Sequence, residues 1–163
     1  MSYRHSAGFG KRIEFYIIGQ MLREGLDVYI PLVDDNGIDA VLRKEDGTYV
    51  EIQIKARSEN VQKGHEALFA AVSHEYRKNY WFIFYSEGFP EPVTWVLSSK
   101  EFIAESRQNK SGQNIGKRTI WFNGKKNGVS YVHDRFMKYK VSSLSERLLN
   151  EDPDWDFRAE VTK

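Results

Sequence analysis

The clearest pattern in the chain is a strict alternation of apolar and polar residues from position 50 to position 55. The apolar positions are Val50, Ile52 and Ile54, and the polar positions are Glu51, Gln53 and Lys55. A period of two residues predicts a β-strand that buries one row of side chains and presents the other. The side chains of Gln53 and Lys55 then point the same way, roughly 6 to 7 Å apart along the strand.

A second strand is predicted from Ile38 to Leu42, with the turn residues Lys44-Glu45-Asp46-Gly47 between the two strands. The loop length of this hairpin decides which side chains share a face. A two-residue loop at Asp46-Gly47 pairs Asp39 with Ile54 and mixes apolar and charged rows. A three-residue loop ending in Gly47 as a G1 bulge pairs Lys44 with Thr48, and hence Asp39 with Gln53. We predict the second register, which gathers a carboxylate, an amide oxygen and an ammonium group.

The rest of the pattern predicts helices and strands along a single domain spanning residues 1–163. Apolar residues at helical spacing predict helices over 11–24 and 61–78, and a capping box at Ser98 and Glu101 predicts a helix through 106. Strands are predicted over 27–30, 80–85, 93–97 and 119–122, with 80–85 as a buried central strand. The order αβββαβ, followed by further β and α elements, predicts an α/β sandwich whose mixed sheet is flanked by helices.

Less regular structure is expected in the C-terminal half. A mobile loop is predicted over residues 108–117, and a basic turn is predicted from Gly124 to Gly128. Ser143 and Glu146 are predicted to cap a last short helix, and the tail after Asn150 is acidic.

Composition narrows the classes of protein that the chain can belong to. With 163 residues it can bury a core of its own, and it has no cysteine and no apolar run long enough to span a membrane. No signal sequence precedes the first helix, so we expect a soluble cytoplasmic protein. The formal net charge is +1, from 24 basic and 23 acidic residues, so a nucleic-acid ligand has to be argued from local patches. His65 and His74 have no cysteine or third histidine near them in sequence, which argues against zinc and favours packing or surface roles.

Positive charge is concentrated in the last third of the chain, interleaved with aromatic residues. The basic residues are Lys110, Lys117, Arg118, Lys125, Lys126, Arg135, Lys138 and Lys140, and the aromatic ones are Trp121, Phe122, Tyr131 and Tyr139. Two interpretations remain open. Either these residues form a surface that binds the phosphates of a nucleic acid, or they are solvated strand and loop residues beside core aromatics. The candidate nucleic-acid contacts are Arg57, Lys117, Arg118, Lys125 and Lys126.

Together, the order of elements and two short motifs resemble the PD-(D/E)XK nuclease superfamily, whose restriction-endonuclease-like fold shares an αβββαβ core. Gly37-Ile38-Asp39 matches the motif aspartate. Gln53-Ile54-Lys55 matches the (D/E)XK segment, in the Gln variant of some Holliday-junction-resolvase-like branches. Glu14 matches a glutamate that several branches carry on the first helix. The resemblance covers residues 11–86, which leaves 87–150 as C-terminal additions and 151–163 as the acidic tail.

The resemblance implies a Mg2+-dependent endonuclease that hydrolyses DNA phosphodiester bonds, with Mn2+ able to substitute. Asp39, Gln53, the backbone carbonyl of Ile54 and Glu14 would hold the ion, since Mg2+ prefers oxygen ligands. Lys55 would orient or help to deprotonate the attacking water and stabilise charge on the phosphate. Glu51 is an alternative source of the negative charge that glutamine at position 53 lacks. Arg57 shares the face of Lys55 and is placed to contact a phosphate.

Two other functions are compatible with the same residues. One is a catalytically inactive nucleic-acid-binding module of the same fold, which would bind DNA with a steep salt dependence and no turnover. The other is an interaction or immunity-type protein that binds a protein partner through the acidic tail and the C-terminal half. A homodimer is expected only by analogy with nucleases that cut two strands.

Overall fold

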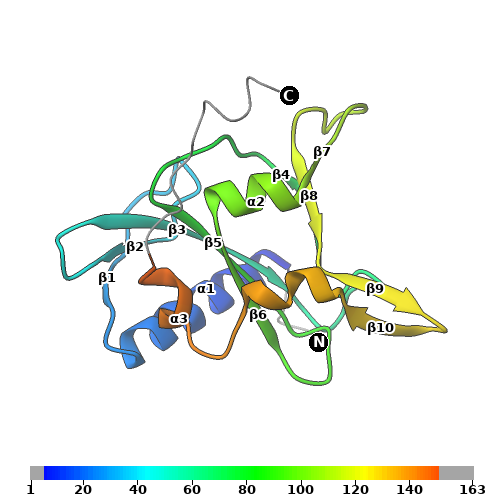
Figure 1. The fold of residues 1–163 in the computed structure, drawn as a ribbon, viewed down its shortest axis with the longest axis horizontal. Coiled ribbons are helices and arrows are strands. Elements are labelled where there is room, and N and C mark those ends of the chain that lie inside the picture. Colours follow the sequence, from blue (N-terminus) through cyan, green and yellow to red (C-terminus); the bar gives the residue numbers. More distant parts are fainter. Residues whose placement is uncertain (1–5, 151–163) are drawn as a thin grey trace.

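The computed structural model of the chain describes residues 6–150, which build a mixed six-stranded sheet and two smaller sheets (Figure 1). The large sheet has the order β1-β2-β3-β5-β6-β11. Its strands are β1 Asp27–Tyr29, β2 Ala40–Arg43, β3 Tyr49–Arg57, β5 Tyr80–Ser86, β6 Val93–Ser98 and β11 Lys140–Val141. Only β3 and β5 pair in parallel in this described sheet, and the other pairs are antiparallel. The predicted α/β fold with a mixed sheet is therefore confirmed, as is the buried strand β5.

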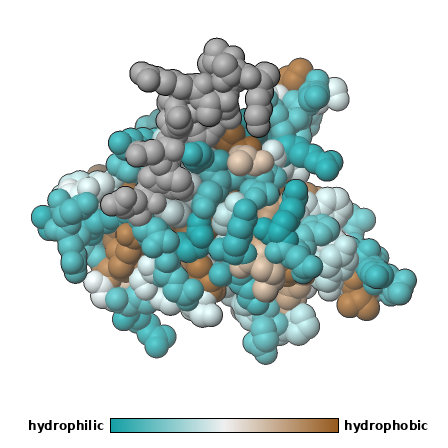
Figure 2. Space-filling view, in the orientation of Figure 1, coloured by the Kyte–Doolittle hydropathy of each residue, from teal (hydrophilic) through white to brown (hydrophobic). Residues whose placement is uncertain are grey.

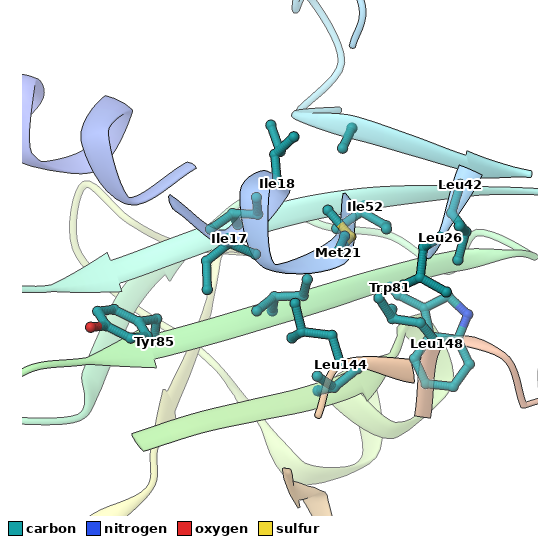
Figure 3. Packing of buried hydrophobic residues seen from close by; sticks show 14 of the residues in the cluster. Ile17, Ile18, Met21, Leu26, Leu42, Ile52, Trp81, Tyr85, Leu144 and Leu148 are labelled. Atoms are coloured by element: carbon teal, nitrogen blue, oxygen red, sulfur yellow. The ribbon is translucent and has the colours of Figure 1, made fainter. Parts of the chain in front are cut away.

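One face of the large sheet is covered by α1 (Ser6–Arg23) and α3 (Ser145–Leu148). From α1, Ile17 and Met21 are fully buried, and they belong to one core cluster with Ile52 of β3 and Trp81 of β5 (Figure 3). The apolar row of the alternating segment faces this core, as predicted. Its polar row faces the other side of the sheet.

The second face carries a three-stranded sheet together with α2 and a 3-10 helix. The sheet has the order β4-β8-β7, with β4 at Leu68–Val72, β8 at Arg118–Trp121 and β7 at Arg107–Gln108. Helix α2 spans Ser99–Glu105 and η1 spans Asp134–Tyr139. Phe82, Phe84 and Trp95 of the large sheet pack here against Phe102 and Phe122. The capping box of Ser98 and Glu101 forms at the start of α2, as predicted.

The helix predicted over residues 61–78 is wrong, because this segment contains β4 and irregular backbone. β4 pairs antiparallel with β8, so that Leu68 faces Trp121 and Phe69 faces Ile120. Phe69 is buried against Phe84 at a ring distance of 4.8 Å. Tertiary pairing with a distant strand thus overrides the helix propensity of the alanine-rich sequence. The connection between the parallel strands β3 and β5 consequently passes through a strand of another sheet.

The end of the described chain departs from prediction in two places. The predicted basic turn is mostly a hairpin, made of β9 (Asn123–Lys126) and β10 (Val129–Val132), which extends from the body in Figure 1. The hydroxyl of Ser143 does not cap α3 but binds Glu24 at 2.8 Å, whereas Glu146 accepts the backbone N–H of Ser143 at 2.7 Å. The predicted loop at 108–117 lies between β7 and β8, and the acidic tail 151–163 falls outside the described residues.

The described surface is largely polar. Figure 2 shows hydrophilic side chains over most of the face seen in Figure 1, with apolar side chains in small separate patches. Within residues 6–150, none of the helices combines the length and the apolar character that crossing a bilayer demands.

Candidate functional site

The polar row of β3 lines a pocket of about 820 Å³ on the face of the sheet opposite α1. Gln53, Lys55 and Arg57 form the β3 side of the pocket, and β4 with the segment after it forms the other side. The predicted common face of Gln53 and Lys55 is present, because alternate residues of a strand point the same way. The rest of the lining has aromatic side chains, two acids (Asp35 and Glu75) and a further cation, Arg77.

The hairpin that carries Asp39 has the predicted loop. The backbone of Lys44 donates to Thr48 at 2.8 Å, Gly47 donates back to Lys44 at 2.9 Å, and Gly47 has a φ of +85°. From Arg43 to Ala40 the ladder follows the predicted register, with Ala40 opposite Ile52. The hairpin therefore has the three-residue loop with glycine at its last position, which the sequence predicted.

The last predicted pair, Asp39 opposite Gln53, is not part of the ladder. The backbone N–H of Asp39 donates to the carbonyl of Ile52 at 2.8 Å, although Ile52 already faces Ala40. Two successive residues thus face one residue of β3, as in a β-bulge. The Asp39 carboxylate then accepts the backbone N–H of Ile54 at 2.7 Å. Asp39 reaches the Gln53-Ile54-Lys55 segment through the backbone of its middle residue, and it is not on the wall of the 820 Å³ pocket.

The environment of Asp39 makes its negative charge costly. Burial raises the pKa of Asp39 from 3.8 to about 6, with the carboxylates of Glu14 and Asp34 adding to the rise. The hydrogen bond from Ile54 and the charge of Lys55 act in the opposite direction and lower this pKa. The structure therefore places three carboxylates and one ammonium group within electrostatic reach of one another.

Glu14 lies on α1 and forms an ion pair with Lys11, one turn earlier on the same helix. Its side chain is 19% exposed, so it lies largely within the protein surface beside Asp39. Lys11 also feels Asp39 and Asp34, which contribute to a raised pKa of the lysine after the larger effect of Glu14. Of the two acids proposed to replace the charge missing at position 53, Glu14 is the one that interacts with Asp39.

Glu51, the alternative acid, is engaged elsewhere. Its carboxylate forms an ion pair with Arg77, whose guanidinium also donates to the carbonyl of Asn36 at 3.1 Å and lies 4.5 Å from the ring centre of Tyr80. Arg77 thus ties β3 to the loop that leads to Asp39. Glu51 therefore binds Arg77, which lines the pocket, and does not line the pocket itself.

Gln53 packs against the turn that precedes Asp39. The hydroxyl of Tyr80 donates to the carbonyl of Gly37 at 2.5 Å. A Cβ placed on Gly37 would lie 2.6 Å from Nε2 of Gln53, and Gly37 has a φ of +69°. Gly37 is therefore needed both for its backbone conformation and for the space that Gln53 occupies.

We expect Gly37→Ala to displace Gln53, and so to reduce the nuclease activity that the sequence leads us to expect, in addition to destabilising the fold by about 1 kcal/mol through backbone strain. Gly47→Ala is the matched control, because Gly47 also has a positive φ but nothing within 4 Å of an added Cβ. Nuclease assays and thermal unfolding on both variants separate the two effects. Equal activity of the two variants at equal stability would remove the positioning role of Gly37.

The proposed phosphate contacts are distributed over several places. Arg57 donates from Nε to the carbonyl of Leu68 at 2.5 Å and so joins β3 to β4, while still lining the pocket. Arg118 donates to the carbonyl of Ile103 at 3.3 Å, which gives it a structural role between β8 and α2. Lys117 binds the side chain of Asn114 at 3.2 Å. Lys125 and Lys126 are exposed on β9.

Packing or surface roles were expected for both histidines, and both are half-buried against aromatic rings. His74 stacks on Tyr80 at 5.0 Å and shares a hydrogen bond of 2.7 Å with Ser99, and burial lowers its pKa to about 4. His65 lies edge-on to Trp121 at 5.7 Å.

The oxygen groups around Asp39 suit a hard cation better than a soft one. Within the described residues no three Asp, Glu, His or Cys side chains come close enough together to form a metal cage. An ion here would rely on Asp39, the Ile54 carbonyl, the Gln53 amide oxygen and several waters, which is how Mg2+ is commonly held. The buried carboxylate with a raised pKa is consistent with such an ion, because a nearby cation relieves the repulsion from Glu14 and Asp34.

Comparison with known proteins gives a structural likeness and no sequence match. No family model and no curated protein matches the chain. Among solved structures, the bacterial homing endonuclease I-Ssp6803I superposes with a TM-score of 0.53 over 83% of this chain and 86% of the other, at 16% identity. The two proteins share a fold. At this identity the likeness establishes the arrangement of elements and leaves the chemistry to be argued from the site.

Several site residues could not be found from the sequence. Arg77 and Tyr80 come from the segment predicted as helix and from the buried strand, and only the packing of the connection beside β3 brings them to Gln53. Asp34 was also missed, although the Asp-rich turn before Asp39 gave a local signal for it. Asp34 accepts the backbone N–H of Ile38 at 2.7 Å and so shapes that turn.

Proposed function

We propose that the protein is a metal-dependent endonuclease that hydrolyses DNA phosphodiester bonds through a PD-(D/E)XK-type site, in the variant with glutamine at the second position. The observation that carries the proposal is the hydrogen bond from Ile54 to the half-buried Asp39 carboxylate, beside Lys55 and Glu14. The homing-endonuclease fold supports the same class of activity.

Each residue has a role that follows from its chemistry. Asp39 is the anionic ligand of a divalent cation, with neutral oxygens from the Ile54 carbonyl and the Gln53 amide. Glu14 supplies the second negative charge, which the neutral side chain of Gln53 does not provide. A bound cation would acidify water and neutralise charge on the phosphate.

Lys55 lies in the pocket beside this group and has no ion-pair partner among the described residues. Lys55 would orient or help to deprotonate the attacking water, and its ammonium group would donate to the phosphate oxygen on which charge develops. Arg57 and Arg77 line the same pocket and add positive charge for the DNA backbone. Against these three basic side chains the pocket has two acidic ones, Asp35 and Glu75, so its polar lining favours an anionic substrate over an apolar one.

The direct test is incubation of the protein with plasmid and branched DNA, in the presence of Mg2+, of Mn2+ or of a chelator. We expect cleavage with either metal, none with the chelator, and none for Asp39→Ala with either metal. Equal cleavage by the wild type and Asp39→Ala would contradict the proposal.

A second candidate function is supported by the neutral side chain of Gln53 and by the fact that no three Asp, Glu, His or Cys side chains in the described part of the chain could hold a metal ion together. These features favour a DNA-binding module of the same fold without turnover. Such a module would bind the same DNA in the presence of chelator, with affinity falling steeply as salt rises, and would leave it intact with either metal.

A further inference from the structure

A second pocket, of about 580 Å³, shares no residue with the pocket of the candidate site. It is formed by β8, by the start of the β9–β10 hairpin and by the segment that precedes β4. Its volume is in the range of small-molecule and nucleotide sites. This pocket has no role in the proposed cleavage chemistry.

Four cations line the second pocket, and none of them has an ion-pair partner among the described residues. They are Lys63, Arg107, Lys125 and Arg135. The single carboxylate on the described wall, Glu105, is already bound by the Tyr139 hydroxyl at 2.9 Å and by Lys138 at 3.3 Å. The chain has a formal net charge of only +1, so this is a local concentration of positive charge in a concave place. Its charge favours a ligand with one or more phosphates.

The same pocket contains an exposed aromatic ring that is held firmly at its edge. The indole Nε1 of Trp121 donates to the side chain of Asn123 at 3.0 Å and to the carbonyl of Gly64 at 3.2 Å. Asn123 is buried, and its Oδ1 also accepts the backbone N–H of Ala67 at 2.9 Å. Trp121 nevertheless stays 44% exposed, which is unusual for a tryptophan anchored in this way. The indole has one edge-on contact, with His65 at 5.7 Å, and lies beside cations that have no ion pair in the described residues. An anchored and partly exposed ring in this setting is suited to stacking on a nucleobase.

We propose that this pocket binds a nucleotide whose base is unstacked, as in a single-stranded end or a looped-out position, with the phosphate on the cations and the base on Trp121. A paired base in a duplex cannot reach the ring without leaving its stack. This inference rests on the proposed function because it takes DNA as the ligand. Binding in the second pocket does not require cleavage. It adds recognition of unpaired DNA as a second activity of the chain.

The test measures binding of a short single-stranded DNA oligonucleotide and of the matching duplex, with chelator present. We expect the wild type to bind the single strand more tightly, and Lys63→Ala with Lys125→Ala to weaken that binding roughly tenfold. The control is Arg23→Ala with Lys78→Ala, which removes the same charge from exposed basic residues outside the pocket and should leave binding nearly unchanged. Neither residue lines the pocket of the candidate site.

A fluorescence measurement tests the stacking independently of charge. Single-stranded DNA should quench the tryptophan emission of the wild type, and Trp121→Phe should abolish most of the quenching while a folded circular dichroism spectrum is retained. An equal loss of affinity in the pocket variant and the control variant, a duplex bound as tightly as the single strand, or quenching unchanged in Trp121→Phe would overturn the proposal. Measuring the same binding with Asp39→Ala separates the two proposals. A variant that loses cleavage and still binds single-stranded DNA is consistent with both, because Asp39 does not line the second pocket.

Discussion

Asp39→Asn is expected to abolish metal-dependent cleavage and, in the absence of metal, to make the protein more stable at neutral pH. Asparagine removes the anionic ligand, for which we expect a loss of roughly a thousandfold in rate. It also removes a half-buried charge whose pKa is raised to about 6. Asparagine keeps an oxygen that can accept the N–H of Ile54, so the hydrogen bond to β3 can persist.

The sign of the stability change follows from the raised pKa. In the unfolded chain Asp39 ionises near 3.8, whereas in the folded protein it resists ionisation until about pH 6. Ionised Asp39 therefore destabilises the fold above about pH 6, and this penalty fades as the pH falls towards 4. Allowing for partial exposure, we expect Asp39→Asn to gain about 1 to 2 kcal/mol at pH 8 and almost nothing at pH 4. Chemical denaturation at both pH values, with chelator, measures the difference.

Asp46→Asn is a matched control on the same hairpin. Asp46 accepts the backbone N–H of Thr48 at 2.8 Å, and this bond lowers the pKa of the exposed Asp46 carboxylate. The lowered pKa means that ionised Asp46 favours the fold above its unfolded pKa, so its substitution cannot stabilise at neutral pH. Asp46→Asn should leave cleavage intact. A destabilised Asp39→Asn at pH 8, or one that cleaves normally, would contradict the assignment of Asp39.

Lys55→Ala is expected to lower cleavage by about a hundredfold or more while changing the free energy of unfolding very little. The loss follows from removing the ammonium group that stabilises charge in the transition state. The fold should tolerate the change because Lys55 is only half-buried and has no ion-pair partner among the described residues. Single-turnover cleavage with saturating DNA measures the chemical step, and thermal unfolding checks the fold.

The control for Lys55 is DNA affinity in the presence of chelator, together with Lys126→Ala, which removes a lysine from the exposed hairpin. Both lysine variants lose one positive charge, so a general electrostatic effect would be similar in the two. If Lys55→Ala cleaves as fast as Lys126→Ala at saturating DNA, Lys55 only binds phosphate and takes no part in the chemistry.

The hairpin could be predicted from the sequence because its signals are local. The alternation from Val50 to Lys55 fixes which row faces the core, and Gly47 fixes the turn, so the register of β2 on β3 follows. The displacement of Asp39 from this register was not predicted. It depends on the hydrogen bond from Ile54 and on the turn closed by Asp34, neither of which a pairing rule contains.

The second helix was predicted wrongly because the decisive contact is far away in sequence. Ala67 to Val72 has good local helix formers, but Phe69 is buried between Phe84 and Phe122, and Leu68 pairs with Trp121. Contacts of this kind appear only when the whole chain is assembled. The same assembly brings Arg77 and Tyr80 to the candidate site, which is why they were missed.

The attachment of Asp39 to the main chain of Ile54 has a bearing on how such a site can evolve. The backbone N–H of Ile54 can bind Asp39 whichever side chain stands at position 53. Replacing Gln53 with an acid would therefore change the charge of the site without moving Asp39. Active and inactive proteins with this fold can then diverge by one substitution at position 53, without a change in the surrounding structure.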